Sequence, residues 1–403
     1  MMFEIVGKVN KAICYAKIIE EEAIKQIERM CDYEFSKDSY IAIMPDVHAG
    51  KGCTIGTTMT IVDKVVPNIV GVDIGCGMYV MKLGKVAIDL AKLDEVCHII
   101  PSGVHCWDQK KVDFDLKSLK CYKQLKNIDR LVQSVGTLGG GNHFIELEVD
   151  QDGCKYLVIH SGSRNLGVQV ANYYQKIAID LHKGKMDYQK KREELIKTYK
   201  ELGKVRQLSD ALKQLQIIYE QKEAKIPEDL CYLYGEYLDD YLYDVEICQQ
   251  FASISREYMG QVILEYLQIQ ALTSFHTIHN YIDVNERILR KGAISAKKDE
   301  LLLIPINMRD GSILGKGLGN PSWNYSAPHG AGRLMSRNKA KELLNIETFK
   351  HEMSHVYTTC VSESTLDESP MAYKSLTDIV DVVADSVEII EILKPIYNFK
   401  ASD

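Results

Sequence analysis

An aspartate and a cysteine lie close together in a part of the chain that is rich in glycine. The stretch "NIVGVDIGCGMYV" covers residues 68–80 and contains Asp73 and Cys76, with glycines at positions 71, 75 and 77. A cysteine that only packs in a core does not need such bare backbone beside it. The pattern therefore indicates that an acid and a thiol are brought close to a ligand.

Four other stretches place histidines at strand ends or beside glycines. They are "GTLGGGNHFIEL" with Asn142, His143 and Glu146, "YLVIHSGSRNLG" with His160 and Arg164, "FHTIHNYID" with His276, His279 and Asn280, and "SAPHGAGRLMSR" with His329, Arg333 and Arg337. A single histidine at a strand end is more often hydrogen-bonded to backbone than bound to a ligand. Its recurrence in one chain favours a shared site.

One combination of these residues has the composition of a metal site. It supplies one carboxylate, one thiol and three imidazoles, from Asp73, Cys76, His143, His160 and His279. This donor set suits Mn²⁺, Fe²⁺, Co²⁺ or Zn²⁺ better than Mg²⁺ or Ca²⁺, which prefer oxygen. Five donors exceed what one tetrahedral site uses, whereas two ions sharing the Cys76 thiolate would use them all and leave positions open for substrate.

Glycines and cations add a signal for phosphate binding. "GTLGGGNH", "HSGSRNLG", "GSILGKGLGN" and "HGAGR" can bring bare backbone N–H groups to phosphate oxygens. Cationic side chains that can bind phosphate lie in or beside these stretches, namely Arg164, Arg309, Arg333, Arg337 and Lys316. Together with the metal donors, they predict nucleotide or phosphoryl chemistry.

Composition limits the class of protein. The chain has 403 residues, a net charge of −7 and 11 cysteines. The acidic balance argues against a surface coated with basic residues, although a local basic groove stays possible. The odd cysteine number and the lack of a C-x-x-C pair predict free thiols. Without an export signal or a long apolar stretch, we expect a soluble, cytoplasmic protein with no membrane attachment.

The elements that must position these residues differ along the chain. The first 170 residues alternate short β-branched runs with glycine-rich turns, and the apolar run before Asp73 predicts a strand that delivers its end to the site. Residues 183–226 predict a charged, solvated helical hairpin that is broken near Gly203 and ends at Pro227.

The second half of the chain predicts a long amphipathic helix, then a glycine-rich part. The helix runs from about Tyr237 to Leu267. After residue 300 we expect a short strand, "LLLIPI", then a long loop to about Arg333, a helix and a final helix. Because motifs lie in both halves, we predict a single α+β domain over residues 1–403 with mixed sheets and the hairpin at 183–226 inserted in it.

The motifs resemble those of one family, the RtcB RNA ligases. "MPDVHAGKGCTIGTT", "VGVDIGCGM", "GTLGGGNHFIEL", "IHSGSRNLG", "HNYI" and "PHGAGR" occur in the order in which that family has them. The resemblance extends from about residue 40 to Lys400 and is interrupted by the hairpin. It implies joining of RNA ends that carry a 2′,3′-cyclic phosphate or 3′-phosphate to a 5′-hydroxyl end, using GTP and Mn²⁺.

The resemblance also implies a role for individual residues. Asp73, Cys76, His143, His160 and His279 match the ligands of two manganese ions, and His329 matches the histidine that becomes guanylylated. Asn142, Glu146, Arg164, Asn280, Arg333 and Tyr373 match nucleotide or phosphate contacts, and Lys400 matches a lysine that faces guanine. Arg337, Arg309 and Lys316 are candidates for RNA phosphate. An archease-type activator is a further partner that the resemblance suggests.

Three features depart from the family pattern. The chain continues as "KASD" where the family ends in Lys-Gly, Ser255 occupies a position where asparagine is expected, and the hairpin is long. These departures touch the role of Lys400, one ligand or nucleotide contact, and the choice of substrate or partner.

Three other functions stay open on the sequence. "HEMSH" at 351–355 matches H-E-x-x-H, which on a helix would place His351 and His355 on a zinc with Glu352 as general base. A guanylyltransferase that caps 3′-phosphate ends without joining them would need the same site. A non-catalytic RNA-binding scaffold fits poorly, because aromatic and basic residues are not interleaved.

Overall fold

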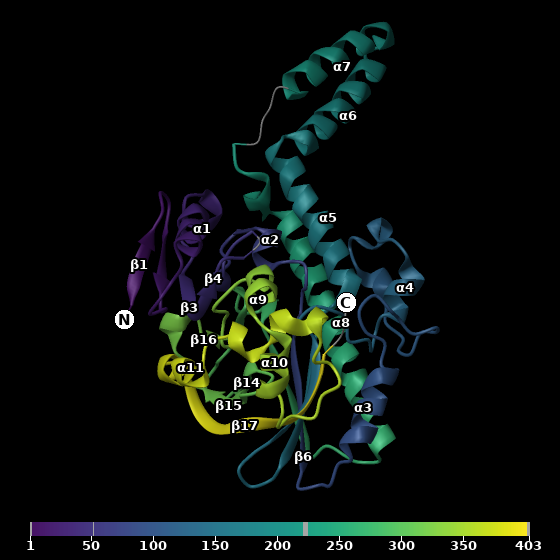
Figure 1. The fold of residues 1–403 in the computed structure, drawn as a ribbon. Coiled ribbons are helices and arrows are strands. Elements are labelled where there is room, and N and C mark those ends of the chain that lie inside the picture. Colours follow the sequence, from purple (N-terminus) through teal and green to yellow (C-terminus); the bar gives the residue numbers. More distant parts are fainter. Residues whose placement is uncertain (1, 51, 221–224, 401–403) are drawn as a thin grey trace.

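The computed structural model describes residues 2–50, 52–220 and 225–400. The fold is α+β, as predicted, with sheets at the centre, helices around them and one helical hairpin that projects from the body (Figure 1). Within these ranges, no helix combines the length and the apolarity needed to cross a membrane.

A seven-stranded antiparallel sheet forms the lower half of the body in Figure 1. Its strands, in spatial order, are β10 Thr273–Ile278, β6 Gly77–Gly84, β8 Lys155–Ser161, β7 Phe144–Val149, β17 Val387–Lys400, β15 Gly311–Gly317 and β14 Leu301–Asn307. The sheet curls so that its two edge strands meet, and the backbone N–H of Leu303 donates to Thr277 Oγ1 at 3.1 Å. Curling leaves an enclosed face that side chains must fill.

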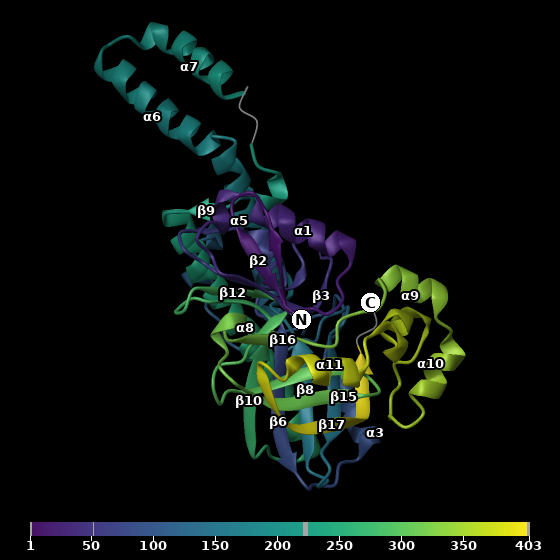
Figure 2. The ribbon, with the colours of Figure 1, turned by 90° about the vertical axis from the view of Figure 1, so that its left-hand side faces the viewer.

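A six-stranded sheet lies above it, as Figure 2 shows from the side. Its strands are β1 Phe3–Val6, β2 Lys11–Cys14, β3 Ile41–His48, β4 Ile55–Thr60, β12 Ile288–Lys291 and β11 Asn280–Asp283. Only the β2–β3 pair is parallel. Two short pairs complete the strands: β13 Ala293–Ser295 with β16 Ser326–Pro328, and β5 Lys64–Val65 with β9 Leu233–Tyr234.

Most of the helices cover these sheets, whereas α6 and α7 project from the body (Figure 1). The helices are α1 Glu21–Cys31, α2 Pro67–Val70, α3 Leu90–Ile99, α4 Ile128–Gln133, α5 Arg164–His182, α6 Lys185–Glu201, α7 Val205–Glu220, α8 Glu236–Leu267, α9 Arg337–Leu343, α10 Ile346–Glu352 and α11 Leu376–Val383. The long helix predicted near 237–267 is α8. Its first half packs with α5 in the large core, and its second half packs on β6 and β8.

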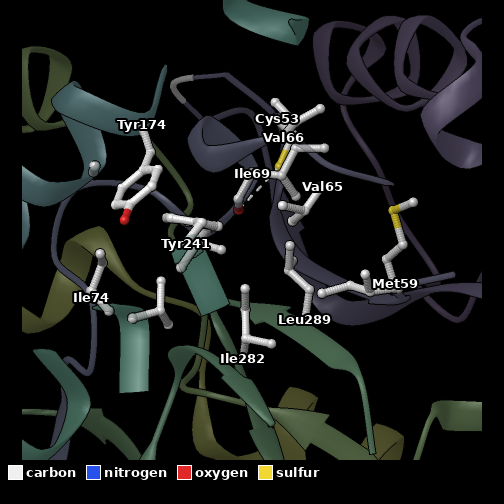
Figure 3. Close-up of a cluster of buried hydrophobic side chains, with 14 of the residues drawn as sticks. Cys53, Met59, Val65, Val66, Ile69, Ile74, Tyr174, Tyr241, Ile282 and Leu289 are labelled. Carbon is white, nitrogen blue, oxygen red and sulfur yellow. Dashed lines mark hydrogen bonds between the residues drawn. The ribbon is translucent and has the colours of Figure 1, made fainter. Parts of the chain in front are cut away.

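The largest core lies between α5, α8 and the six-stranded sheet (Figure 3). Side chains from distant parts of the chain meet there, including Ile69 of α2, Tyr174 of α5, Tyr241 of α8 and Leu289 of β12. Because these elements surround the turn that carries Asp73 and Cys76, the core fixes the position of that turn.

The predicted hairpin is present as α6 and α7. The chain turns at Gly203, whose φ of 66° is one that glycine adopts readily. No residue of α6 is buried, so the solvated character is confirmed. Residues 221–224 of the predicted range lie outside the described residues. That the hairpin is an insertion within a single ligase domain stays a prediction.

Two expectations about the first half are wrong. The first 170 residues contain the helices α1, α3 and α4 as well as strands and turns. The apolar run before Asp73 is the short helix α2, which begins at Pro67 and stops at Gly71, and the strand β6 starts only after Cys76. Proline is favoured in the first turn of a helix, and a φ of 92° at Gly71 ends it.

The glycine-rich segment after residue 300 is also not a loop. It contains β15 and β16, and "KPIYNFK" forms the end of β17. The glycines of β15 permit close packing instead of a turn, because a Cβ on Gly317 would lie 2.2 Å from the carbonyl oxygen of Lys297. A strand that passes this close to neighbouring backbone needs glycines, so its composition resembles that of a loop.

Candidate active site

The sheet brings the predicted metal donors together. Asp73 and Cys76 lie in the turn before β6, His143 directly precedes β7, His160 is in β8, and His279 lies between β10 and β11. Because β8 pairs with both β6 and β7, and β10 pairs with β6, the ends of these strands meet at one place.

Short distances join the five donors, which we call the donor cluster. Cys76 Sγ lies 3.2 Å from His160 Nε2 and 3.5 Å from His143 Nε2. His143 Nε2 lies 3.2 Å from Asp73 Oδ2, and His160 Nε2 lies 3.4 Å from His279 Nε2. Cys76, His143 and His160 form the one group of three possible metal ligands found among the described residues.

Neighbouring groups aim the imidazoles inward. The Nδ1 atoms of His143 and His160 lie 2.9 and 3.2 Å from the carbonyl oxygens of Leu138 and Asn142. A ring that donates from Nδ1 presents a lone pair on Nε2, which is the arrangement of a metal-bound histidine. The donor cluster therefore fits a metal ion by chemistry and by orientation.

Burial sets the protonation of the cluster. It lowers the pKa of His160 and of His279 well below the usual value, and neighbouring histidines add to this effect. Both rings are therefore neutral, as ligands must be. Burial and the Asp73 carboxylate raise the pKa of Cys76 well above normal, so a thiolate here needs a cation beside it.

Two structural features hold this turn in place. The buried Arg256 of α8 donates from Nη1 to the carbonyl oxygens of Gly75 and Ser161, at 2.7 Å each. Gly162 leaves room for the carboxylate, since a Cβ there would lie 2.0 Å from Asp73 Oδ1. Ser255, adjacent on α8, accepts a hydrogen bond from the backbone N–H of Gly136 at 2.9 Å, so it supports the loop before His143 and does not reach the cluster.

His329 lies beside the donor cluster and pairs with a buried acid. Its ring centroid is 5.1 Å from that of His279. His329 Nδ1 is 2.7 Å from Asp46 Oδ2, and the backbone N–H of His329 donates to the same oxygen at 3.2 Å. Asp46 is completely buried. This pairing fixes the ring and leaves Nε2 as the free, basic nitrogen.

A cavity of about 390 Å³, which we call the first cavity, connects the donor cluster to most of the other predicted residues. Of the predicted residues, the first cavity is lined by Asp73, Cys76, Asn142, Glu146, His160, His279, Asn280, His329, Arg333, Arg337, Tyr373 and Lys400. His48, which the sequence reasoning did not single out, also lines it. The site thus extends from the metal donors past His329 to the end of β17.

A buried glutamate organises the far end of this cavity. Glu368 contacts Lys400 Nζ at 2.5 Å, the hydroxyl of Tyr373 at 2.7 Å, Arg337 at 3.1 Å and Arg333 at 3.4 Å. Burial alone would raise the pKa of Glu368, but Lys400 and Arg337 outweigh it and lower the pKa to about 2. The glutamate is therefore ionised and holds three cations at the cavity wall.

Arg164 lies on the other side of the cluster. It lines a second cavity of about 490 Å³ together with Arg130, and this cavity shares Asp73 and His143 with the donor cluster. Arg164 donates to the carbonyl oxygen of Gly103 at 2.6 Å. Gly139 makes room for this side chain, because a Cβ there would lie 1.8 Å from Arg164 Nη1.

Three predicted cations or histidines line neither of the two cavities. Arg309 pairs with Asp310 at 2.8 Å and with Glu352, and Lys316 lies in β15 outside both cavities. His276 is turned toward Glu257 at 3.0 Å. Their sequence signals were proximity to glycines or to another histidine, which does not determine side-chain direction.

The H-E-x-x-H hypothesis is wrong. Helix α10 ends at Glu352, and His355 lies beyond it, so the two histidines do not share a helix face. Glu352 is paired with Arg309 and is not available as a base.

Three residues that hold the site were missed by the sequence reasoning. Asp46 stands in "MPDVHAGKG", a quoted motif, and a lone acid within an apolar strand is a usable signal. Arg256 and Glu368 have no glycine or histidine within three positions of sequence, and only the fold shows their contacts.

Comparison with known proteins decides the family. The family profile described as tRNA-splicing ligase RtcB matches residues 26–127 and 115–401. The chain belongs to the RtcB family. It is 32% identical over 400 residues to the RNA-splicing ligase RtcB of Escherichia coli (strain K12), with 89% of each chain covered. It is 26% identical to the tRNA-splicing ligase RtcB of Aeropyrum pernix, with 85% of this chain and 84% of the relative covered.

Membership in the RtcB family and the buried cluster both indicate a metal-binding site. The resemblance inferred from the motifs is confirmed, and the cysteine–histidine cluster of this RtcB chain is suited to bind a metal. All the cysteines in the described ranges are free, as the composition predicted.

Proposed function

We propose that this RNA ligase joins an RNA end carrying a 2′,3′-cyclic phosphate or a 3′-phosphate to an RNA end carrying a 5′-hydroxyl, with GTP as second substrate. The observation that carries the proposal is the pairing of His329 with buried Asp46 at the edge of the donor cluster. A histidine with an oriented free nitrogen next to a metal site is equipped for phosphoryl transfer.

The donor cluster would hold two Mn²⁺ ions, through Asp73, Cys76, His143, His160 and His279. When bound, the ions would neutralise the charge of the phosphates and stabilise the departing pyrophosphate. The softness of the thiolate and imidazoles supports Mn²⁺ over Mg²⁺ or Ca²⁺.

His329 acts as the nucleophile toward GTP. Asp46 accepts a hydrogen bond from Nδ1–H, so the lone pair of Nε2 is free. A bond forms between Nε2 and the α-phosphorus while the bond from that phosphorus to pyrophosphate breaks, which leaves GMP on the histidine.

The RNA ends then react in three steps. Water breaks the bond from the 2′-oxygen to the cyclic phosphorus and leaves a 3′-phosphate. An oxygen of that phosphate attacks the GMP phosphorus as the bond to His329 breaks. The 5′-hydroxyl oxygen attacks the RNA 3′-phosphorus, its proton passes to solvent, and GMP leaves.

The far end of the first cavity suits guanine. Glu146 of β7 and Lys400 of β17 line it from adjacent strands. A carboxylate accepts from the N1–H and the amino group of guanine, and an ammonium donates to its O6. Adenine presents an acceptor at N1 and a donor at position 6, so these side chains favour GTP over ATP.

Polar and cationic side chains around the centre supply contacts for phosphate. We assign Asn142, Asn280, Arg333 and Tyr373 to the nucleotide side, because they line the first cavity. Arg337, whose side chain is 45% exposed, lies at its edge. Arg164 faces the second cavity with Arg130, and we assign it to an RNA phosphate.

Mass spectrometry after incubation with Mn²⁺ and GTP tests this function. We expect a GMP adduct on His329, none in His329→Ala protein, and joined product when RNA ends carrying a 2′,3′-cyclic phosphate and a 5′-hydroxyl are added. Capped but unjoined RNA would favour the guanylyltransferase. We also propose an archease-type activator as a partner. A requirement of RNA joining, but not of GMP labelling, for a cell extract would support it.

A further inference from the structure

A second buried glutamate lies behind Glu146 on the same strand. In "FIELEV", which forms β7, Glu146 and Glu148 are two residues apart, so both side chains point to the enclosed face of the curled sheet. Glu148 is completely buried, opposite Tyr156 of β8 and Pro395 of β17. The surrounding side chains are those of an apolar cluster that includes Val158, Leu303, Leu314 and Leu393.

The contacts of the two carboxyl groups are unequal. Glu146 accepts a hydrogen bond from the side-chain amide of Asn398 and lines the first cavity. Neither oxygen of Glu148 has a donor in hydrogen-bonding geometry among the described residues. Its polar neighbours are the hydroxyl of Ser312 and the carboxyl group of Glu146, which is within hydrogen-bonding reach. A buried carboxylate without donors is costly, and two in contact are more so.

A proton between the two groups removes this cost. Burial raises the pKa of both, that of Glu148 well above its usual value and that of Glu146 to about 7. Asn398, Glu148 and Lys400 act on Glu146 in the opposite sense and favour its ionised form. Only the Ser312 hydroxyl lowers the pKa of Glu148, and it does not offset burial and the nearby Glu146 carboxylate, so the proton belongs to Glu148.

The other charged or titratable groups described on this face have partners of their own. Lys400, on β17 beyond Asn398, is paired with Glu368. The hydroxyl of Tyr156, on β8 opposite Glu148, is 3.3 Å from Asp150 at the strand end. His160, at the other end of β8, points its Nε2 into the donor cluster. Among the described residues, Glu146 is the one carboxyl group that shifts the pKa of Glu148.

We propose that Glu148 is a positioning residue, which donates a proton-bearing hydrogen bond to Glu146 and so keeps the Glu146 carboxylate available as the acceptor that selects guanine. The inference rests on the proposed function, since it requires a guanine nucleotide in the first cavity. It adds a residue that touches no substrate and acts on base selection through its neighbour.

Two variants separate the hydrogen bond from packing. Glu148→Gln keeps a donor, because its amide can donate to Glu146, whereas Glu148→Met has a similar volume and no donor. Tyr156→Phe is the matched control, since it removes from the residue opposite Glu148 a hydroxyl that contacts Asp150 and neither glutamate. Thermal melting monitored by circular dichroism verifies that each protein is folded.

The affinities for GMP and AMP, measured by calorimetry on the full chain with Mn²⁺, are the readout. We expect Glu148→Met to weaken GMP binding by about tenfold at pH 7 with little change for AMP, because a hydrogen bond to a charged group is lost. Glu148→Gln and Tyr156→Phe should stay within about twofold of wild type.

The pH dependence gives an independent readout. A carboxylate acceptor exists above its pKa, so GMP affinity of the wild type should rise with pH through about 7. In Glu148→Met the rise should move to higher pH, and in Glu148→Gln it should not. A shift in the midpoint is not expected from a change in packing alone.

The inference would be overturned if Glu148→Met bound GMP and AMP as tightly as wild type does. It would also be overturned if the Met and Gln variants lost GMP affinity to the same extent. The binding measurement needs no transfer to His329. A wild-type protein that binds GMP selectively but shows no GMP adduct with GTP would therefore refute the proposed function and leave the role of Glu148 intact.

Discussion

Cys76 is held from several sides, whereas the residues of α6 contact mainly α7 and the end of α5. The turn that carries Cys76 is fixed by Arg256 of α8, by the start of β6 and by His143 and His160 from neighbouring strands. The hairpin, by contrast, has no buried residue in α6 and projects from the body (Figures 1 and 2). A site that needs atoms a few ångströms apart is built where several elements converge, and a part that only reaches outward can depend on one neighbour.

Removing the Cys76 thiol should give the largest effect. Cys76→Ala should reduce GMP labelling of His329 to the background of the assay and lower the Mn²⁺ content measured by mass spectrometry. Loss of groups behind a metal ligand already costs about 10–100-fold, and a direct ligand costs more. Cys248→Ala, at another fully buried thiol, is the control and should keep its metal. Full labelling of Cys76→Ala would show that the convergence at this turn serves stability alone.

Asp46→Asn should have the next largest effect. Asparagine preserves the shape but removes the charge that fixes the His329 tautomer, so the rate of GMP labelling should fall by about ten-thousandfold. Metal content and melting temperature should change little. Asp63→Asn, at an exposed aspartate of the same half of the chain, should label at the wild-type rate. Unchanged labelling in Asp46→Asn would mean that the histidine is oriented by its backbone alone.

Glu368→Gln should show a smaller effect, visible in stability against pH. The pKa of Glu368 is lowered from 4.5 to about 2 when the protein folds. A depressed carboxyl pKa adds stability above pH 4.5, worth about 3 kcal/mol, that is lost as pH falls toward 2. Urea unfolding at pH 7 and pH 3 should therefore show a large gap between wild type and variant at pH 7 that narrows at pH 3.

The exposed Glu342 of α9 supplies the control for that experiment. Glu342→Gln should change the free energy of unfolding by less than about 0.5 kcal/mol at either pH, because it lies on the surface. A gap for Glu368→Gln that does not depend on pH would contradict the ionised network and indicate a packing role.

The site and the hairpin also differ in how well the sequence predicts them. Donor residues such as Asp73 and His143 can be predicted from local motifs, because glycine and metal-binding chemistry constrain neighbouring positions. Their supports do not, since Asp46 meets His329 across 283 positions of sequence. Such pairings arise from strand register, which depends on the whole sheet.

The hairpin shows the opposite balance. Its helices were predictable from charge and periodicity alone, because local propensity decides a helix that packs little. The strand β15 was not, since close backbone contacts require glycines that resemble a loop signal. A strand fixed by close backbone contacts, such as β15, is thus harder to predict from local sequence than a helix with clear periodicity, whether exposed as α6 or buried as α8.

Cutting the hairpin should have the smallest effect on activity, and hydrogen exchange should show how the hairpin and the sheet differ in dynamics. We expect amides of α6 and α7 to exchange well before those of β7 and β8, because the hairpin can open without exposing a buried core. Limited proteolysis near Gly203 should cut first. The nicked protein should label His329 at the wild-type rate, because the donor cluster keeps all its supports. Equal protection of hairpin and sheet, or loss of labelling on cleavage at Gly203, would show that the two regions are coupled and that α6 and α7 help to position the site.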